Sequence, residues 1–292
     1  MTLFKGSGVA IVTPFDDNLE IDFDRFEKLI EFQIENGTDA LIVCGTTGEA
    51  ATMTAEEQVS LVSFAVDKTN GWIPIIAGAG GNNTKVAVEM AKKMEEAGAD
   101  GILSVNPYYN KGTQDGIVEH YHRQADSVSI PIIIYNVPGR TGSNMGPKLV
   151  KRIFEHENIT GIKEASGNIV QAMEVLNECE DIDMYSGNDD VIIPLMSIGS
   201  KGVISVLANV LPRETSEMCH LYLDGEYEKA GLMQRKYLRL INALFAEVNP
   251  SPVKACMDLM GLEGGKLRLP LTQSSQKTID ELKLALEELE LI

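Results

Sequence analysis

Tryptophan, histidine and cysteine are scarce in this chain, which has one Trp, four His and four Cys in 292 residues. The cysteines lie far apart and form no CxxC pair, so the sequence predicts neither a zinc knuckle nor a disulfide framework and favours a reducing compartment. The first residues lack the hydrophobic length and the cleavage pattern of a signal peptide. No stretch approaches the roughly 18 apolar residues that span a bilayer. We therefore expect a cytoplasmic protein.

Basic residues are also few, since 25 Lys and Arg stand against 43 Asp and Glu and give a formal net charge of −18. Such a balance excludes nucleic acid and an anionic membrane as the main partner, because both need a basic surface. Hydrophobic residues at 44% and charged residues at 23% exclude a disordered or fibrous chain. The length predicts one large domain or two smaller ones.

Short apolar runs recur at intervals of roughly 20 to 30 residues, a period typical of repeated βα units. Their apolar character is nearly continuous instead of alternating, which indicates strands buried on both faces of a parallel sheet. Amphipathic helical patterns lie between them at 22–36, 54–70 and 83–97, and Thr54 with Glu57 forms a capping-box signature. The eight predicted strands lie within 7–15, 39–45, 73–80, 99–109, 130–138, 159–166, 182–189 and 201–209.

Eight such units predict a closed (β/α)8 barrel, the TIM barrel, in the α/β class. A doubly wound open sheet is the alternative, and the lack of a GxGxxG motif after the first strand disfavours it. After residue 209 the sequence predicts helices only. The first of these closes the eighth unit and the other three form a C-terminal appendage, at 212–224, 226–247, 252–261 and 276–290. The expected division is a catalytic barrel at 1–225 and a C-terminal helical domain at 226–292.

In such a barrel the active site lies at the carboxyl ends of the strands. Lys163 occupies the end of the sixth predicted strand, in a segment otherwise built for burial. Desolvation favours the neutral amine, which is the form that attacks carbonyl groups, so Lys163 is a candidate Schiff-base nucleophile. The alternative is a lysine that pairs with Glu164 or with another carboxylate at a strand end.

Hydroxyl groups surround this position in the other predicted loops. A relay through Tyr135, Thr46, Thr47 and Tyr109 could move protons without a histidine. The alternative is that the tyrosines are core or interface aromatics and that the Thr-Thr-Gly sequence is only a turn. Arg140 follows a Val-Pro-Gly turn and suits bidentate capture of a carboxylate, with a loop salt bridge as its alternative.

No metal site is expected. His120 and His122 are two apart on a predicted helix, point in different directions and cannot share a metal. His156 and His220 are isolated in the sequence. The Asp189-Asp190 pair is better explained as a polar loop at the start of a helix.

Over nearly its whole length the chain resembles the dihydrodipicolinate synthases of the pyruvate-dependent class I aldolase family. Two C-terminal stretches match this family, Asn-Pro-Ser-Pro-Val-Lys at 249–254 and Leu-Arg-Leu-Pro at 267–270. The main motifs are Gly-Thr-Thr-Gly-Glu at 45–49, Tyr-Asn-Val-Pro-Gly-Arg-Thr-Gly at 135–142, Gly-Ile-Lys-Glu-Ala at 161–165 and Gly-Val-Ile-Ser-Val at 202–206.

The resemblance implies a catalytic set of four residues. Lys163 would form an imine with pyruvate, and Tyr135 would donate and accept protons. Thr46 and Tyr109 would complete the relay, with Tyr109 reaching in from a neighbouring subunit. The family's assembly would be a homotetramer, as a dimer of dimers, or at least a homodimer. No external cofactor is implied, because the protonated imine is itself the electron sink.

The resemblance also implies the substrate-binding residues. Thr47 and the backbone at Ile204 would hold the pyruvate carboxylate and the imine region, and Gly187 is assigned to substrate binding with them. Arg140 would take the carboxylate of aspartate semialdehyde. The implied reaction is the condensation of these two substrates to 4-hydroxy-tetrahydrodipicolinate, in the diaminopimelate and lysine pathway.

Two other functions fit the same barrel. The family includes N-acetylneuraminate lyases and 2-keto-3-deoxy sugar-acid aldolases, but Arg140 and the Tyr108-Tyr109 pair match the semialdehyde branch. A regulatory binding protein without turnover is the third possibility, and the retention of every relay residue argues against it.

The chain departs from the family pattern at an interface pocket that binds lysine in inhibited relatives. The corresponding positions are Ala55, Gln58, Asn82 and Val86, and the side chains of Ala55 and Val86 cannot bind an ammonium or a carboxylate. We therefore expect weak or absent feedback by lysine. Gly112 stands where relatives often carry Pro, which affects the stiffness of its loop and not the chemistry.

Overall fold

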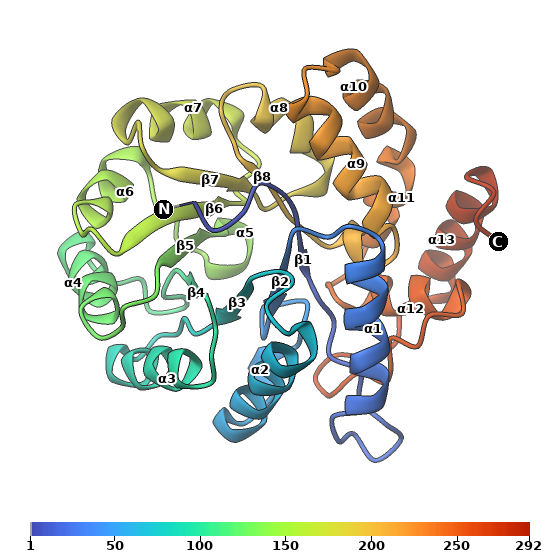
Figure 1. The fold of residues 1–292 in the computed structure, drawn as a ribbon, viewed down its shortest axis with the longest axis horizontal. Coiled ribbons are helices and arrows are strands. Elements are labelled where there is room, and N and C mark those ends of the chain that lie inside the picture. The colour runs from blue at the N-terminus through green and yellow to red at the C-terminus, as the bar shows by residue number, and fades with distance from the viewer. Residues whose placement is uncertain (1) are drawn as a thin grey trace.

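The computed structural model describes residues 2–292 as a closed barrel of eight parallel strands surrounded by helices (Figure 1). Each strand pairs with its neighbours in the sequence, and β1 closes the barrel against β8. The expected (β/α)8 architecture is confirmed. The strands are β1 (Gly6–Ala10), β2 (Ala40–Val43), β3 (Ile75–Gly78), β4 (Gly101–Val105), β5 (Ile132–Asn136), β6 (Ile159–Glu164), β7 (Asp183–Ser186) and β8 (Gly202–Ser205).

The helices of the first three repeating units begin where the sequence predicts, and the capping box at Thr54 and Glu57 is confirmed. Asp22 caps α1, Thr54 and Glu57 form both hydrogen bonds of a capping box on α2, and Asn83 caps α3. These side chains satisfy the free N–H groups of the first turns, which fixes where each helix leaves its loop. The helices of this part are α1 (Phe23–Glu35), α2 (Ala55–Thr69), α3 (Thr84–Glu96), α4 (Gln114–Ala125), α5 (Pro138–Thr141), α6 (Pro147–Phe154), α7 (Ile169–Glu178), α8 (Ile192–Met196) and α9 (Pro212–Leu223).

The C-terminal segment is helical, as expected, but its first helix is interrupted. The expectation of one helix over 226–247 is wrong, because Tyr237 lies between two helices with a ψ of 0°, which departs from α-helical geometry. An amphipathic pattern continues across a break of one residue, so periodicity does not reveal the interruption. The four helices that follow α9 are α10 (Tyr227–Lys236), α11 (Leu238–Leu244), α12 (Ser251–Leu259) and α13 (Gln276–Glu288).

Two buried layers explain why the strands are apolar on both faces. Ile132 and Ile134 of β5 belong to the layer between the strands and the helices. Ile133 and Tyr135 alternate with them and belong to the layer inside the barrel. Because successive side chains of a strand point to opposite faces, a barrel strand needs apolar residues at nearly every position. Tyr135 is therefore directed into the barrel by its register.

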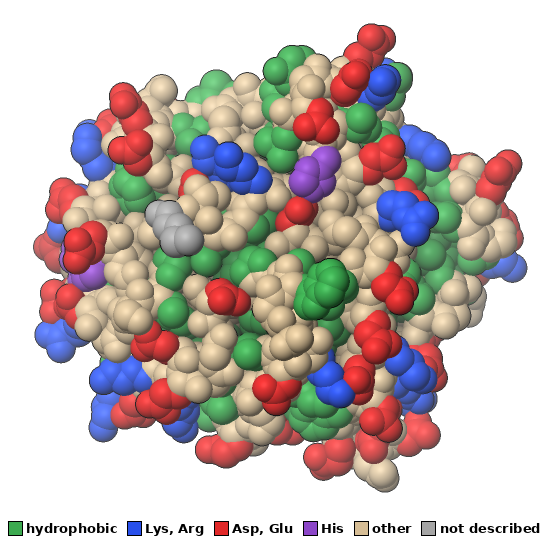
Figure 2. Space-filling model, in the orientation of Figure 1, with side chains coloured by type: hydrophobic (Ala, Val, Ile, Leu, Met, Phe, Trp, Pro, Cys, Tyr) green, Lys and Arg blue, Asp and Glu red, His purple; other side chains and the backbone are tan. Residues whose placement is uncertain are grey.

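Figure 2 shows the charges on one face of the molecule, where acidic side chains are interspersed with basic ones. Among residues 2–292, no helix is both long enough and apolar enough to cross a membrane.

Candidate active site

The ends of β5 and β6 bring Lys163 and Tyr135 together. In the parallel pairing of these strands Tyr135 is the register partner of Lys163, and Asn136 is the partner of Glu164. The Lys163 Nζ lies 4.5 Å from the centre of the Tyr135 ring. Lys163 is 6% exposed and Tyr135 is 7% exposed. The register thus places an amine against the face of a phenol in a site that water barely reaches.

Burial governs the charge of Lys163. It lowers the pKa of Lys163 to about 8, the negative charge of Asp189 opposes this change, and the positive charge of Arg140 adds to it. Within residues 2–292, Lys163 forms no ion pair. The alternative of a structural salt bridge to Glu164 is therefore wrong. A lysine in this state supplies the neutral amine near neutral pH.

Glu164 is held by neutral donors instead. Its Oε2 accepts a hydrogen bond of 3.0 Å from Asn136 Nδ2, and its Oε1 accepts one of 2.7 Å from the Ser166 N–H. The Asn136 Oδ1 in turn accepts a bond of 3.0 Å from the Met145 N–H. This buried network connects the ends of β5 and β6, so it fixes the position of the Tyr135 ring relative to Lys163.

Tyr135 is a protonated phenol. Burial raises its pKa to about 12, while the charge of Arg140 and a hydrogen bond with the Thr46 side chain act in the opposite direction. The structure thus brings Lys163, Tyr135 and Thr46 together, as the sequence predicts. A phenol with a hydroxyl neighbour can both give and receive a proton.

Thr46 and Thr47 lie on a tight turn after β2. The Glu49 N–H donates to the Thr46 carbonyl at 3.1 Å, and the Thr13 hydroxyl donates to the Gly48 carbonyl at 2.7 Å. Thr47 is 2% exposed, and its Oγ1 accepts a hydrogen bond of 2.9 Å from Asn249 Nδ2. Because that oxygen accepts from Asn249, the Thr47 hydroxyl proton is directed to another acceptor. A bound carboxylate is an acceptor of the right kind.

Gly187 allows the backbone to approach Lys163. It follows β7, and its N–H donates to the Glu164 carbonyl at 2.8 Å. A Cβ at this position would lie 2.6 Å from the Ala165 Cβ and 3.1 Å from the Lys163 Cε. Only glycine fits there. Ile204 of β8 is buried in the same inner layer as Tyr135.

Tyr109 and Arg140 lie at the outer edge of the site, in the segments that follow β4 and β5. Tyr109 follows β4 in a left-handed conformation with a φ of 71°, and its side chain is 89% exposed. Its N–H donates to the Thr141 carbonyl at 3.4 Å, which connects the Tyr109 loop to α5. Arg140 is an exposed residue of α5. The Tyr109 ring does not pack into the site of its own chain.

Asp189 lies at a helix start, as predicted, because it begins the 3₁₀ helix Asp189–Val191 before α8, but the prediction missed its role in the site. Asp189 is 1% exposed, and its Oδ2 accepts hydrogen bonds of 2.9 Å from the N–H groups of Val206 and Leu207. Burial raises its pKa, and its charge acts on Lys163. Its place after the seventh strand of a barrel was the available signal. Asn249 lies in a stretch that matches the family, but its contact with Thr47 spans 202 positions of sequence, so no local pattern predicts it.

Within residues 2–292, no group of three or more His, Cys, Asp and Glu side chains could hold a metal ion. His120 is buried, shares a hydrogen bond of 3.0 Å with the Thr84 hydroxyl, and has a pKa lowered by burial to about 4. It is a neutral packing residue.

Comparison with known proteins identifies the family of the chain. The model of the dihydrodipicolinate synthetase family matches residues 3–289. The chain belongs to this family. The 4-hydroxy-tetrahydrodipicolinate synthase of Caldicellulosiruptor bescii is 53% identical to this chain, over 98% of this chain and 97% of the relative. The synthase of Acetivibrio thermocellus is 52% identical over 99% of both chains.

Solved structures show the same fold. The dihydrodipicolinate synthase of Thermotoga maritima superposes with a TM-score of 0.96 and 43% identity, over 100% of both chains. The family and the relatives named as synthases identify the chain as an enzyme, and its fold is a (β/α)8 barrel.

Proposed function

We propose that the enzyme acts as a 4-hydroxy-tetrahydrodipicolinate synthase, which condenses pyruvate with L-aspartate 4-semialdehyde in diaminopimelate and lysine biosynthesis. The observation that carries the proposal is the buried Lys163 at the end of β6, with its pKa lowered to about 8 and its amine against the Tyr135 ring. A desolvated amine beside a proton donor is the arrangement that imine formation requires.

The proposed chemistry begins when the neutral Lys163 amine attacks the keto carbon of pyruvate and water leaves. Loss of a methyl proton from the imine gives an enamine, whose carbon then attacks the aldehyde. The amine of the second substrate closes the ring onto the former keto carbon, and the bond to Lys163 breaks. Every step moves protons, and Tyr135 with Thr46 is the pair that we assign to these transfers.

We assign substrate binding to four positions of the site. The Thr47 hydroxyl and the backbone at Ile204 would hold the pyruvate carboxylate and the imine region. Gly187 would leave room beside Lys163, and Arg140 at the rim would bind the carboxylate of the semialdehyde. Attraction of the pyruvate anion and of the semialdehyde carboxylate to an acidic protein then depends on local groups and not on the net charge of −18.

The experiment that tests this function is reductive trapping. Incubation with pyruvate and borohydride should attach the reduced adduct to Lys163, as identified by peptide mass analysis. Lys254 is an internal control, because it is also buried but its Nζ lies 2.6 Å from the Glu49 carboxylate. An adduct on Lys254, or none on Lys163, would refute the proposal. Turnover of N-acetylneuraminate or of a sugar acid without semialdehyde activity would assign the enzyme to another branch.

We propose further that Tyr109 completes the relay of a neighbouring subunit, in a homotetramer or at least a homodimer. The support for this proposal is that Tyr109, which the relay requires, is 89% exposed and does not pack into the site of its own chain. Subunits with Lys163→Ala and subunits with Tyr109→Ala should be inactive alone and regain activity when they are co-expressed, because a mixed pair contains one intact site. A lack of recovery in a mixed assembly shown by mass would contradict the assignment.

We also propose a cytoplasmic location, which the four free and buried cysteines support. The division into a catalytic barrel at 1–225 and a helical domain at 226–292 stays a proposal. Since Asn249 contacts Thr47, we expect the barrel expressed without 226–292 to bind pyruvate poorly.

A further inference from the structure

A buried ion pair connects the C-terminal segment to the loop that carries Thr46 and Thr47. The Lys254 Nζ lies 2.6 Å from the Glu49 Oε1, and the two side chains are 2% and 0% exposed. The ammonium also donates to the carbonyls of Thr13 at 2.8 Å and Lys266 at 2.6 Å. Two of its N–H groups are therefore directed to carbonyls of fixed position, while its charge pairs with the Glu49 carboxylate.

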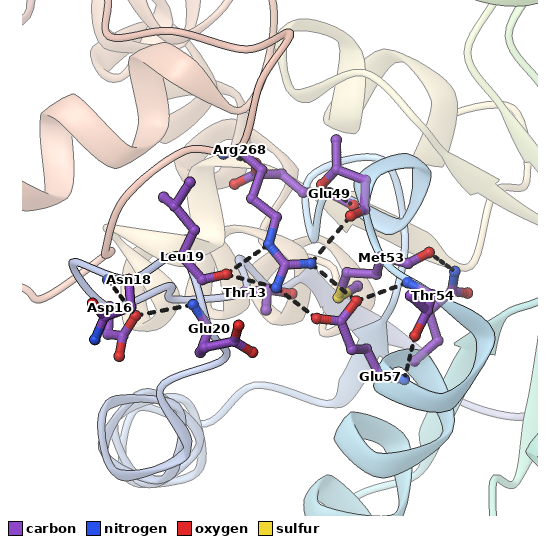
Figure 3. A network of polar contacts seen from close by, with 12 residues as sticks. Thr13, Asp16, Asn18, Leu19, Glu20, Glu49, Met53, Thr54, Glu57 and Arg268 are labelled. Carbon is purple, nitrogen blue, oxygen red and sulfur yellow. Dashed lines mark hydrogen bonds and ion pairs between the residues drawn. The ribbon is translucent and has the colours of Figure 1, made fainter.

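The second carboxylate oxygen of Glu49 is held as well. Its Oε2 accepts a hydrogen bond of 3.1 Å from the Arg268 N–H. Figure 3 shows the Arg268 side chain between Glu49 and Glu57, with its guanidinium group directed also to the Leu19 carbonyl. The Arg268 guanidinium pairs with Glu57, so the same residue attaches the C-terminal segment both to the loop and to α2.

Glu49 is itself part of the loop that holds the two threonines. Its backbone has a left-handed φ of 56°, and its N–H closes the turn on the Thr46 carbonyl. The adjacent Thr47 is held by Asn249 from the same C-terminal segment. The side chain of Glu49 and the hydroxyl of Thr47 thus have separate anchors on one distant part of the chain.

Stability alone does not account for this arrangement. Removing two charges from water costs about as much as their attraction returns, so a buried ion pair adds little net stability compared with apolar residues of similar size. What the pair supplies is direction, because it permits one position of the Glu49 side chain and therefore one position of the turn. Burial lowers the pKa of Lys254, and the charge of Glu49 opposes that change.

We propose that Glu49 and Lys254 are positioning residues, which hold the turn at 45–49 so that the Thr47 hydroxyl faces the pyruvate carboxylate. This inference rests on the proposed function for the identity of the ligand. We call the pair of Glu49 and Lys254 the clamp. Arg140 lies on a different segment, α5, so binding of the semialdehyde does not depend on the clamp.

The test compares Glu49→Gln and Lys254→Met with the control Glu57→Gln. The control removes a carboxylate that also holds the C-terminal segment, but one that lies on α2 and not in the turn. Glu49→Gln and Lys254→Met should raise the KM for pyruvate at least tenfold while the KM for the semialdehyde stays within twofold. Glu57→Gln should leave both KM values within twofold of the wild type.

A double variant, Glu49→Gln with Lys254→Met, keeps the test decisive if a single variant unfolds, because it leaves no buried charge without a partner. It should fold and retain the raised KM for pyruvate. Unchanged KM values, with kcat reduced only in proportion to the folded fraction, would show a structural role and overturn the proposal.

Amide hydrogen exchange of residues 45–50 gives a readout that needs no substrate. Exchange should be faster in Glu49→Gln and in the double variant than in Glu57→Gln. Equal exchange in all variants would also overturn the proposed positioning role of the clamp. If the wild type traps no imine on Lys163 but the exchange rates differ as stated, the proposed function has failed and the clamp has not.

Discussion

The pH at which Lys163 reacts with pyruvate depends on its burial and on two neighbouring charges that can be removed one at a time. Burial lowers the pKa of Lys163 from 10.5 to about 8, which corresponds to about 3 kcal/mol of differential stabilisation of the neutral amine. At pH 7 about one molecule in ten then carries the neutral amine, against about one in three thousand for an unperturbed lysine. The reactive fraction is therefore about 300 times larger.

Two substitutions should move this pKa in opposite directions. The carboxylate of Asp189 favours the ammonium, so Asp189→Asn should lower the pKa below about 8. The guanidinium of Arg140 disfavours the ammonium, so Arg140→Met should raise it. Asp190→Asn is the matched control, because Asp190 is the exposed neighbour of a buried acid and its removal should leave the pKa unchanged.

The assay is the initial rate of pyruvate trapping on Lys163 with cyanoborohydride, measured below saturation between pH 6 and pH 10. Under these conditions the rate follows the ionisation of the free enzyme and rises with pH as the amine loses its proton. The wild-type midpoint should lie near pH 8. A midpoint near 10.5, a shift of both variants in the same direction, or an equal shift in Asp190→Asn would refute the reasoning.

Four further outcomes follow from the site. Tyr135→Phe should lower kcat by at least about 100-fold in steady-state assays, because a phenyl ring cannot transfer protons; an unchanged rate would instead favour a binding protein. Gly187→Ala should abolish imine trapping, since its Cβ would lie 2.6 Å from another Cβ and 3.1 Å from the Lys163 Cε. Lys254→Met should lower the free energy of unfolding in urea by about 3 to 5 kcal/mol, because it leaves a buried carboxylate unpaired. Lysine should inhibit weakly or not at all, since Ala55 and Val86 offer no group to bind it; inhibition at micromolar lysine would contradict this.

The local features were accessible from the sequence because each depends on neighbours along the chain. Apolar runs marked every strand, and the capping box of Thr54 and Glu57 marked a helix start. Lys163 was recognisable because a charged residue in a buried strand is costly to desolvate. The break at Tyr237 was not accessible, since it leaves the amphipathic pattern intact.

The sequence by itself determined the barrel, the order of its units and the lysine at the end of the sixth strand, because periodicity and desolvation act over short segments. Only the tertiary structure decided which groups surround that lysine. The register of β5 and β6 placed Tyr135 against it, and barrel closure buried Asp189 beside it. Folding of the C-terminal segment brought Lys254 to Glu49 across 205 positions (254 − 49). Such contacts join residues that are far apart in the sequence and form only when the chain folds, so no local pattern encodes them.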